Sequence, residues 1–95
     1  MHGIVFEWDP RKDLTNRQKH GVGFEVASTV FDDPLSITIP DPDHSMDEDR
    51  FVIVGASSEH GLLVVVHTMR GERIRLVSAR AATKHEKRSY EESSA

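Results

Sequence analysis

Cysteine is absent from this 95-residue chain. Its absence excludes disulfide bridges and thiolate zinc sites, and it is compatible with a reducing cytosol. No hydrophobic run approaches the roughly 20 residues that a membrane-spanning helix needs. The first residues, MHGIVFEWDP, lack the pattern of a signal peptide. We therefore expect a soluble cytoplasmic protein.

Internal repeats and low-complexity linkers are also absent, so we expect one small domain over residues 1–95. A chain of this size buries only about 60–65% of the surface that it exposes when unfolded, which is enough for one sheet with helices on one side. The net charge of -4 is unusual for a nucleic-acid binder, but it is unevenly spread. Residues 1–61 hold 5 Lys and Arg against 12 Asp and Glu, whereas residues 62–95 hold 7 against 4. A locally positive field is therefore expected towards the carboxyl terminus.

The segment Leu62–Arg80 predicts a β-hairpin, because two β-branched runs flank a short turn at Met69–Glu72. We expect Thr68 to pair with Arg73. Side chains alternate across a strand, which gives two sets. These are Arg73, Arg75 and Val77 on one face, and Ile74, Leu76 and Ser78 on the other. One face should be apolar, and the other should carry a row of guanidinium groups, which are suited to phosphate.

The remaining elements follow from start and stop signals and from hydrophobic periodicity. The first three are a strand over Ile4–Trp8, a helix from Asp9-Pro10 to Gly21 and a helix over Phe24–Phe31. A strand over Leu35–Ile39, with Ser36 and Thr38 outward, is followed by an acidic loop over Pro40–Arg50 and a strand over Phe51–Ser57. A tail helix over Lys84–Glu92 begins with a Thr83 to Glu86 capping box. The order β-α-α-β-β-β-α indicates an α+β fold. We expect a mostly antiparallel sheet, two amino-terminal helices on one face and a short carboxy-terminal helix.

Short motifs recur in order along nearly the whole chain. They are FEWD at 6–9, KHGV at 19–22, FEVA at 24–27, FDDP at 31–34, RFVIVG at 50–55, HTMRGERIR at 67–75 and SAR at 78–80, with Glu86 and Tyr90-Glu91 at the end. This set resembles the BrnT toxins of type II toxin-antitoxin modules, which are small ribonucleases with a RelE-like fold. The resemblance implies an endoribonuclease that arrests growth.

The resemblance also implies the partners. A BrnA-type, DNA-binding antitoxin would neutralise the toxin, and the chain would reach operator DNA only through that antitoxin. We expect an RNA substrate, no cofactor and no membrane contact. The alternative is a non-catalytic binding module that uses the same basic face and acts as a subunit of a DNA-bound regulatory complex.

Cleavage of RNA without a metal requires a base for the 2′-hydroxyl, cations for the phosphate and an acid for the leaving 5′-oxygen. We expect Arg70, Arg73 and Arg75 to hold the phosphate. The candidate bases and acids are His67, Lys12, His20, Arg80 and Tyr90. Contacts to the remainder of the RNA are expected from Lys12, Lys19, His20, Lys84 and Tyr90.

Each of these side chains also has a plainer interpretation. Exposed strand arginines are ordinarily solvated, and strand parity directs His67 into the core. By the same parity Arg80 shares a face with Ile74 and Leu76, where a salt bridge to a carboxylate is favoured over catalysis. Tyr90 is as well suited to anchoring the tail helix as to contacting a base.

The acidic loop contains a possible metal-ligating group, His44 with Asp41, Asp43, Asp47 and Asp49. Their spacing matches neither a helical H-x3-H pair nor an EF-hand loop. We therefore expect a solvated acidic loop and no metal site.

Overall fold

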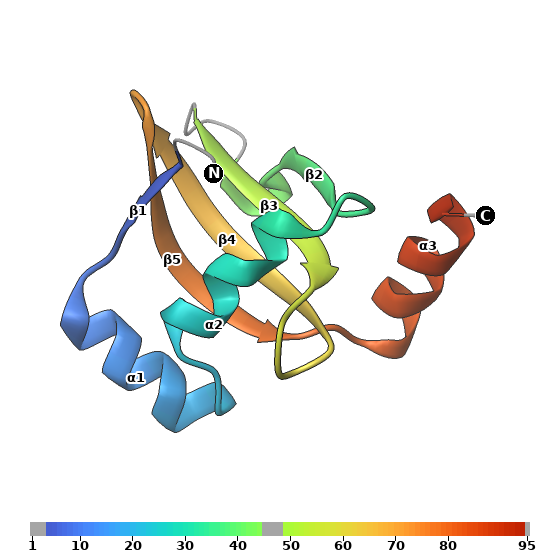
Figure 1. Ribbon diagram of the computed structural model, residues 1–95, viewed down its shortest axis with the longest axis horizontal. Coiled ribbons are helices and arrows are strands. Elements are labelled where there is room, and N and C mark those ends of the chain that lie inside the picture. The colour runs from blue at the N-terminus through green and yellow to red at the C-terminus, as the bar shows by residue number, and fades with distance from the viewer. Residues whose placement is uncertain (1–3, 45–48, 95) are drawn as a thin grey trace.

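The computed structural model describes residues 4–44 and 49–94 (Figure 1). Its elements are β1 (Val5–Glu7), α1 (Pro10–His20), α2 (Phe24–Ser28), the 3-10 turn η1 (Thr29–Asp32), β2 (Ile37–Pro40), the 3-10 turn η2 (Pro42–His44), β3 (Arg50–Ala56), β4 (Leu62–Arg70), β5 (Arg73–Ala81) and α3 (Lys84–Ser94). The order is therefore β-α-α-β-β-β-β-α, and the predicted order has one strand too few because it counts the predicted hairpin as a single strand. No helix in the described ranges is long and apolar enough to cross a membrane.

The five strands form one mostly antiparallel sheet in the order β1-β5-β4-β3-β2. Among the strands that the structure describes, only β1 and β5 run parallel. In the hairpin Thr68 lies opposite Arg75 and Arg70 opposite Arg73, so the predicted pairing of Thr68 with Arg73 is wrong by two positions. The strands continue to a two-residue turn whose first residue, Gly71, has a φ of 63°. A shift of two residues leaves the predicted faces of the two strands unchanged near the turn.

A β-bulge interrupts β5 at Val77. Val66 pairs with Ser78 and His67 pairs with Leu76, so Val77 has no partner on β4. An extra residue reverses the alternation of side chains beyond it. The predicted positions of Ser78 and Arg80 beside Leu76 are therefore wrong. Both residues share the face of the sheet that carries Arg75, and both line the same groove there.

The opposite face of the sheet is covered by α2 and η1, and we call it the covered face (Figure 1). Phe24, Ala27 and Val30 are fully buried there, as the predicted helix over Phe24–Phe31 requires. The last residues of that segment form η1 and not a continued α-helix. Gly55 permits the close packing, because a Cβ at this position would lie 3.0 Å from the carbonyl oxygen of Val30. The uncovered side is called the open face.

Helix α1 begins and ends as predicted. The Asp9 side chain accepts a hydrogen bond from the Arg11 amide, Pro10 is the first helical residue, and Gly21 caps the end with a φ of 72°. Its anchor is Asn16, which is buried, whereas Leu14 is 50% exposed. Polar contacts of Asn16 therefore hold α1 against the edge of β5.

Helix α3 lies at the end of the molecule opposite β1 (Figure 1). The predicted capping box is confirmed: the Thr83 amide donates to Glu86 Oε1 at 2.8 Å, and the Glu86 amide donates to Thr83 Oγ1 at 3.2 Å. The helix extends to Ser94, two residues beyond the predicted end. Its position leaves the hairpin arginines uncovered.

Candidate functional site

Three arginines meet around one carboxylate on the open face. Arg75 Nη1 lies 3.0 Å from Glu7 Oε2, Arg73 Nη1 lies 3.4 Å from Glu7 Oε1, and Arg70 Nη1 lies 3.7 Å from Glu7 Oε2. The arginine side chains are 60%, 65% and 38% exposed for Arg70, Arg73 and Arg75. We call these three residues the arginine cluster. Three cations against one carboxylate leave an excess of positive charge that is open to solvent.

The pairing of the strands builds this cluster. The parallel register places Glu7 opposite Arg75, and the tight turn brings Arg70 opposite Arg73. Hydrogen bonding from Arg75, followed by that from Arg73, lowers the pKa of Glu7 against the opposing effect of burial. Glu7 is therefore ionised at neutral pH. The sequence places Glu7 on the strand face opposite Phe6 and Trp8, but it does not show that this face meets the arginines.

A hollow of about 480 Å³ adjoins the arginine cluster. It is lined by Lys12, Asp49, Arg50, Thr68, Met69, Arg70, Arg75 and Val77. Four of these side chains are cationic, and one of them is Lys12 of α1, which was predicted to contact RNA. Arg50 was not singled out from the sequence. Its Nε lies 3.2 Å from Asp41 Oδ2, and its side chain is only 24% exposed.

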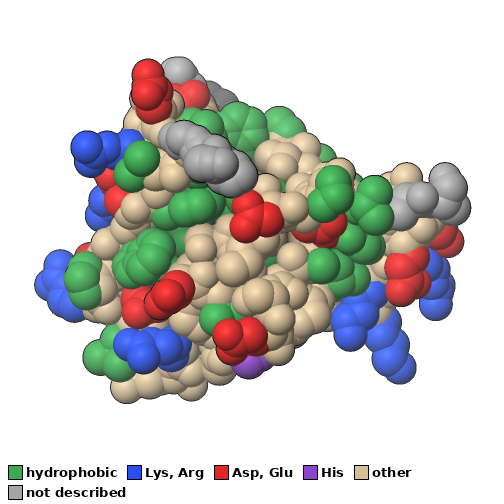
Figure 2. Space-filling model, in the orientation of Figure 1, with side chains coloured by type: hydrophobic (Ala, Val, Ile, Leu, Met, Phe, Trp, Pro, Cys, Tyr) green, Lys and Arg blue, Asp and Glu red, His purple; other side chains and the backbone are tan. Residues whose placement is uncertain are grey.

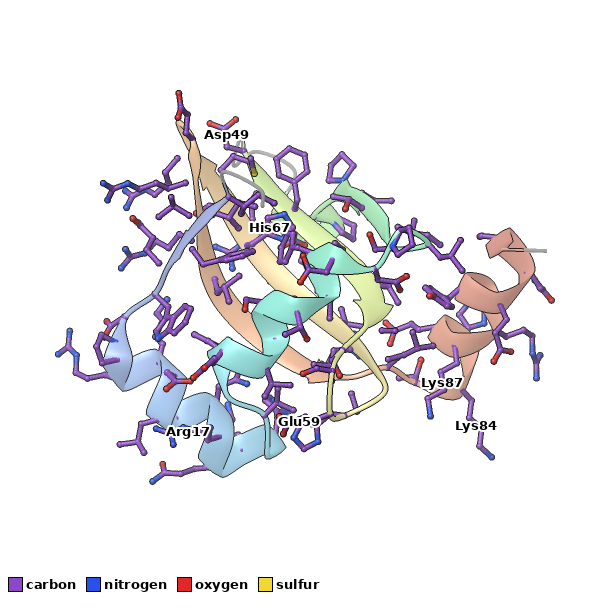
Figure 3. All side chains as sticks on the ribbon, in the orientation of Figure 1. Arg17, Asp49, Glu59, His67, Lys84 and Lys87 are labelled. Atoms are coloured by element: carbon purple, nitrogen blue, oxygen red, sulfur yellow. The ribbon has the colours of Figure 1, made fainter. Side chains whose placement is uncertain are left out.

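A second hollow of about 510 Å³ runs between α1 and β5. Its lining includes Lys12, Lys19 and His20, which are three of the residues predicted to contact RNA. Lys12 and Val77 line both hollows, so the basic surface of α1 is continuous with the arginine cluster. Lys84 lies elsewhere: it is on α3 and points away from the sheet together with Lys87 (Figure 3).

The positive charges lie at two ends of the molecule. On the side of the molecule that α2 covers, Lys and Arg side chains gather beside β1 and α1 and on α3, and the centre carries none (Figure 2). On this face of the molecule the two sets of cations are therefore separate.

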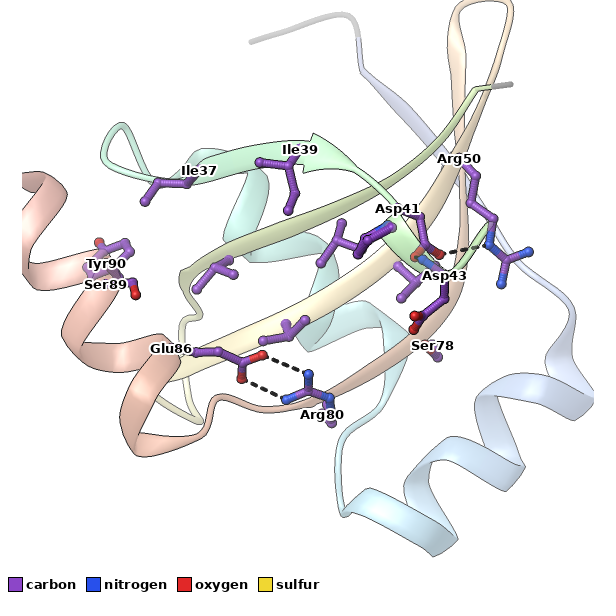
Figure 4. Close-up of a pocket in the computed structure, with 15 residues that line it drawn as sticks. Ile37, Ile39, Asp41, Asp43, Arg50, Ser78, Arg80, Glu86, Ser89 and Tyr90 are labelled. Atoms are coloured by element: carbon purple, nitrogen blue, oxygen red, sulfur yellow. Dashed lines mark hydrogen bonds and ion pairs between the residues drawn. The ribbon is translucent and has the colours of Figure 1, made fainter. Parts of the chain in front are cut away.

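The rest of the open face is an apolar groove of about 520 Å³ (Figure 4). Its apolar lining is Ile37, Ile39, Val52, Val54, Val64 and Val66. We expected Ser36 and Thr38 to face outward from a half-exposed strand. Thr38 is exposed as predicted, whereas Ser36 is half-buried and lies close to Gly55. Ile37 and Ile39 face the groove, and Ile39 is 49% exposed.

Two ion pairs border the groove (Figure 4). One is Arg50 with Asp41, and the other is Arg80 with Glu86, where two parallel bonds of 2.8 Å join the guanidinium to the carboxylate. The bond from Arg80 lowers the pKa of Glu86 to about 2, although burial opposes the shift. The salt bridge favoured for Arg80 is thus confirmed, and its guanidinium is already occupied.

His67 belongs to the core. It is 2% exposed, and its ring packs against Phe31 at 4.9 Å and Phe51 at 6.0 Å between centroids, behind η1 (Figure 3). Burial lowers the pKa of His67, and its Nδ1 has no hydrogen-bond partner in the described part of the chain. The position that strand parity predicts is confirmed. Because the ring lies on the covered face, His67 is not a candidate base or acid for a ligand bound on the open face.

Tyr90 anchors α3. Its hydroxyl donates to Asp33 Oδ2 at 2.5 Å, and Asp33 also accepts from the amides of Leu35 and Ala56 at 2.9 and 2.8 Å. Burial raises the pKa of Asp33, but the bonds from Tyr90 and the two amides outweigh it and the net pKa is lowered. The bond to this carboxylate raises the pKa of Tyr90. The ring lines the end of the groove, away from the arginine cluster.

Comparison with known proteins gives a family match and a structural match. Residues 8–86 match the model of a family described as the ribonuclease toxin BrnT of type II toxin-antitoxin systems. The chain is also similar to the crystal structure of the Brucella abortus ribonuclease toxin BrnT, with a TM-score of 0.65 and 21% sequence identity over 85% of this chain and 97% of that one. Among curated proteins, none matches this sequence. The structural likeness establishes the fold, and the family match extends over most of the chain.

Proposed function

Because this chain belongs to the BrnT family of ribonuclease toxins of type II toxin-antitoxin systems, and is an endoribonuclease by that membership, we propose that the arginine cluster holds the RNA phosphate during cleavage. The observation that carries the proposal is the convergence of Arg70, Arg73 and Arg75, all exposed to solvent, on the single carboxylate of Glu7. Planar guanidinium forks bind phosphate oxygens in pairs, and exposed side chains give a polyanion access to them. Membership of the family implies an antitoxin and an RNA as partners.

The proposed role of the cluster is to stabilise charge. As the 2′-oxygen attacks phosphorus, negative charge grows on the non-bridging oxygens, and prearranged cations stabilise it more than they stabilise the ground state. Arg70 and Arg75 line the adjoining hollow together with Lys12 and Arg50. These side chains provide the positive charge that the reaction needs, so the proposed cleavage does not require a metal ion.

Lys12 is the proposed donor of the proton to the leaving 5′-oxygen. It lines the same hollow as Arg70 and Arg75 and forms no ion pair with a described residue. An ammonium group has a proton that it can donate to the leaving alkoxide oxygen. The neighbouring Lys19 and His20 would then extend the contact to the flanking RNA backbone.

We propose that a BrnA-type, DNA-binding antitoxin neutralises the toxin by covering the apolar groove and the rim of the arginine cluster. The groove exposes isoleucine and valine side chains, and it shares Arg50 with the hollow beside the cluster. A segment laid in the groove would therefore reach the arginines as well. In this proposal the unpartnered toxin arrests growth in the cytoplasm, and it contacts operator DNA only as part of the antitoxin complex.

The test is cleavage of RNA by the purified chain with and without EDTA. We expect cleavage to persist in EDTA and to fall about 100-fold or more in Arg75→Ala and Arg73→Ala. Arg88→Ala is the matched control, because it removes an exposed arginine from α3, which lies away from the cluster. Cleavage that requires a divalent metal, or an equal loss in all three variants, would contradict the proposal.

A further inference from the structure

Glu7 occupies the centre of the arginine cluster. We propose that its carboxylate takes the place of the RNA phosphate in the free protein and becomes the general base for the 2′-hydroxyl when RNA binds. This inference rests on the proposed function, since it assigns a role to one more residue of the same site. It concerns the group that accepts the proton.

The geometry makes Glu7 a substitute for a phosphate. Its two carboxylate oxygens divide the cluster, with Oε1 towards Arg73 at 3.4 Å and Oε2 towards Arg75 at 3.0 Å and Arg70 at 3.7 Å. A phosphodiester presents the same feature, two anionic oxygens that accept from guanidinium forks. The arginines are therefore held close together before RNA arrives. Without the carboxylate, three like charges at this spacing would repel one another.

Binding of RNA would displace this carboxylate from the guanidinium groups but leave it beside the phosphate. When the phosphate oxygens take over the bonds from Arg73 and Arg75, the lone pairs of Glu7 become available and its proton affinity rises, because the compensating cations now face the phosphate. Glu7 then lies next to the phosphate, which is where the 2′-hydroxyl of the preceding ribose must be for in-line attack. Its side chain is 24% exposed, so the hydroxyl has access to it.

The step balances with groups already named. Glu7 accepts the proton from the 2′-hydroxyl, the 2′-oxygen forms a bond to phosphorus, and the bond from phosphorus to the 5′-oxygen breaks. The 5′-oxygen leaves with a proton from Lys12. The products are a 2′,3′-cyclic phosphate and a 5′-hydroxyl end, and no oxidant, reductant or further reactant is consumed.

Other carboxylates of the open face are less suited to this role. Asp41 and Glu86 are held by Arg50 and Arg80 at the borders of the groove. Asp9 caps α1 through the Arg11 amide. Asp49 lines the hollow beside the cluster but forms no ion pair with a described residue. Among these groups only Glu7 contacts the guanidinium groups that would hold the phosphate.

The experiment measures cleavage and binding separately in the full chain. Cleavage is measured as a single-turnover rate constant with RNA, and binding is measured with a 2′-O-methyl copy of the same RNA, which cannot be cleaved. For Glu7→Gln we expect the rate constant to fall about 100-fold or more, the range expected for loss of a general base. Affinity for the 2′-O-methyl RNA should be unchanged or tighter, because a competing negative charge has been removed. Glu91→Gln, on the exposed surface of α3, is the matched control and should behave as wild type.

Three results would overturn the inference. They are cleavage by Glu7→Gln at the wild-type rate or faster, weaker binding that accounts for the whole loss, and a loss that appears in Asp49→Asn but not in Glu7→Gln. Failure of the wild type to cleave, or full activity of Arg75→Ala, would instead contradict the proposed function.

A second variant applies if circular dichroism shows that Glu7→Gln does not fold. Glu7→Asp keeps the negative charge, but its shorter side chain moves the carboxylate away from the RNA. A tenfold or greater loss of rate with wild-type affinity supports the inference, and an unchanged rate overturns it.

The pH dependence gives a readout that a structural role would not produce. The charged groups around Glu7 are Arg70 from β4 and Arg73 and Arg75 from β5, with Lys12 of α1, Asp49 and Arg50 in the adjoining hollow. The single-turnover rate constant of the wild type should therefore fall as a carboxylate in this site is protonated. Residual activity of Glu7→Gln should lack this acid limb, and an identical limb in both proteins would overturn the inference.

Discussion

Asn16 of α1 and Ala79 of β5 are joined by two hydrogen bonds of the kind that strands exchange. The Asn16 Nδ2 donates to the Ala79 carbonyl at 2.8 Å, and Asn16 Oδ1 accepts from the Ala79 amide at 3.1 Å. β1 pairs with β5 only at residues 73–75, so the later part of that edge lacks a strand partner among the described residues. The side-chain amide of Asn16 forms the backbone hydrogen bonds that a neighbouring strand would form at this edge. It thereby fixes α1, and with it Lys12, beside the arginine cluster.

Replacing Asn16 with alanine should destabilise the fold by about 2–4 kcal/mol, since it leaves the Ala79 amide and two buried carbonyls without partners. Asn16→Asp should cost at least as much, because a carboxylate would face the carbonyls of Val22 and Ala79. Urea denaturation is the measurement, with Gln18→Ala on the exposed side of α1 as the control. A loss below about 0.5 kcal/mol in both Asn16 variants would show that the edge does not depend on this amide.

Acid should weaken the attachment of α3 to the sheet through Glu86. The pKa of this carboxylate is lowered from 4.5 to about 2 in the folded protein, so its contribution to stability is fully present above pH 4.5 and is lost as the pH falls towards 2. Glu86→Gln keeps the capping box but removes this dependence. Thermal melts from pH 7 to pH 2.5 should therefore show a smaller fall of Tm in Glu86→Gln than in the wild type. Parallel curves would contradict the assignment.

Local signals in the sequence predicted much of the fold. Asp9-Pro10 and Gly21 delimit α1, and the capping box starts α3, because the residues responsible are neighbours in the chain. The bulge at Val77 has no such signal, and it alone moves Arg80 to the open face. The partnership of Glu7 with the arginines depends on a parallel pairing between the two ends of the sequence. Alternation identified the arginine row, but only the tertiary fold shows which carboxylate joins it.

Tyr90→Phe should loosen α3 without unfolding the domain. It removes the bond from the hydroxyl to Asp33 and leaves the two amide bonds to that carboxylate in place. We expect a small loss of stability, because one hydrogen bond to a charged group is removed. Faster hydrogen exchange should be confined to the amides of α3. Unchanged exchange in α3, or equal acceleration in β3 and β4, would show that Tyr90 does not anchor this helix.

The apolar groove predicts a separation between antitoxin binding and RNA cleavage. Ile39→Asp places a charge in the groove at an exposed position and should weaken binding of a BrnA-type antitoxin at least tenfold, while the rate of RNA cleavage stays within twofold of wild type. Thr38→Asp is the matched control, because Thr38 lies on the same strand but does not line the groove. Binding is measured by titration calorimetry with the purified antitoxin. Equal effects of the two variants would remove the groove from the interface.

The most direct test of the arginine cluster is the single-turnover rate constant of Arg75→Lys at saturating RNA. Lysine keeps the charge but not the planar fork that bridges two phosphate oxygens. If Arg75 holds the phosphate in the transition state, the rate constant should fall about 10-fold or more with little change in RNA affinity, and Arg88→Lys should have no effect. A rate constant for Arg75→Lys equal to that of the wild type would contradict the placement of the phosphate at this cluster.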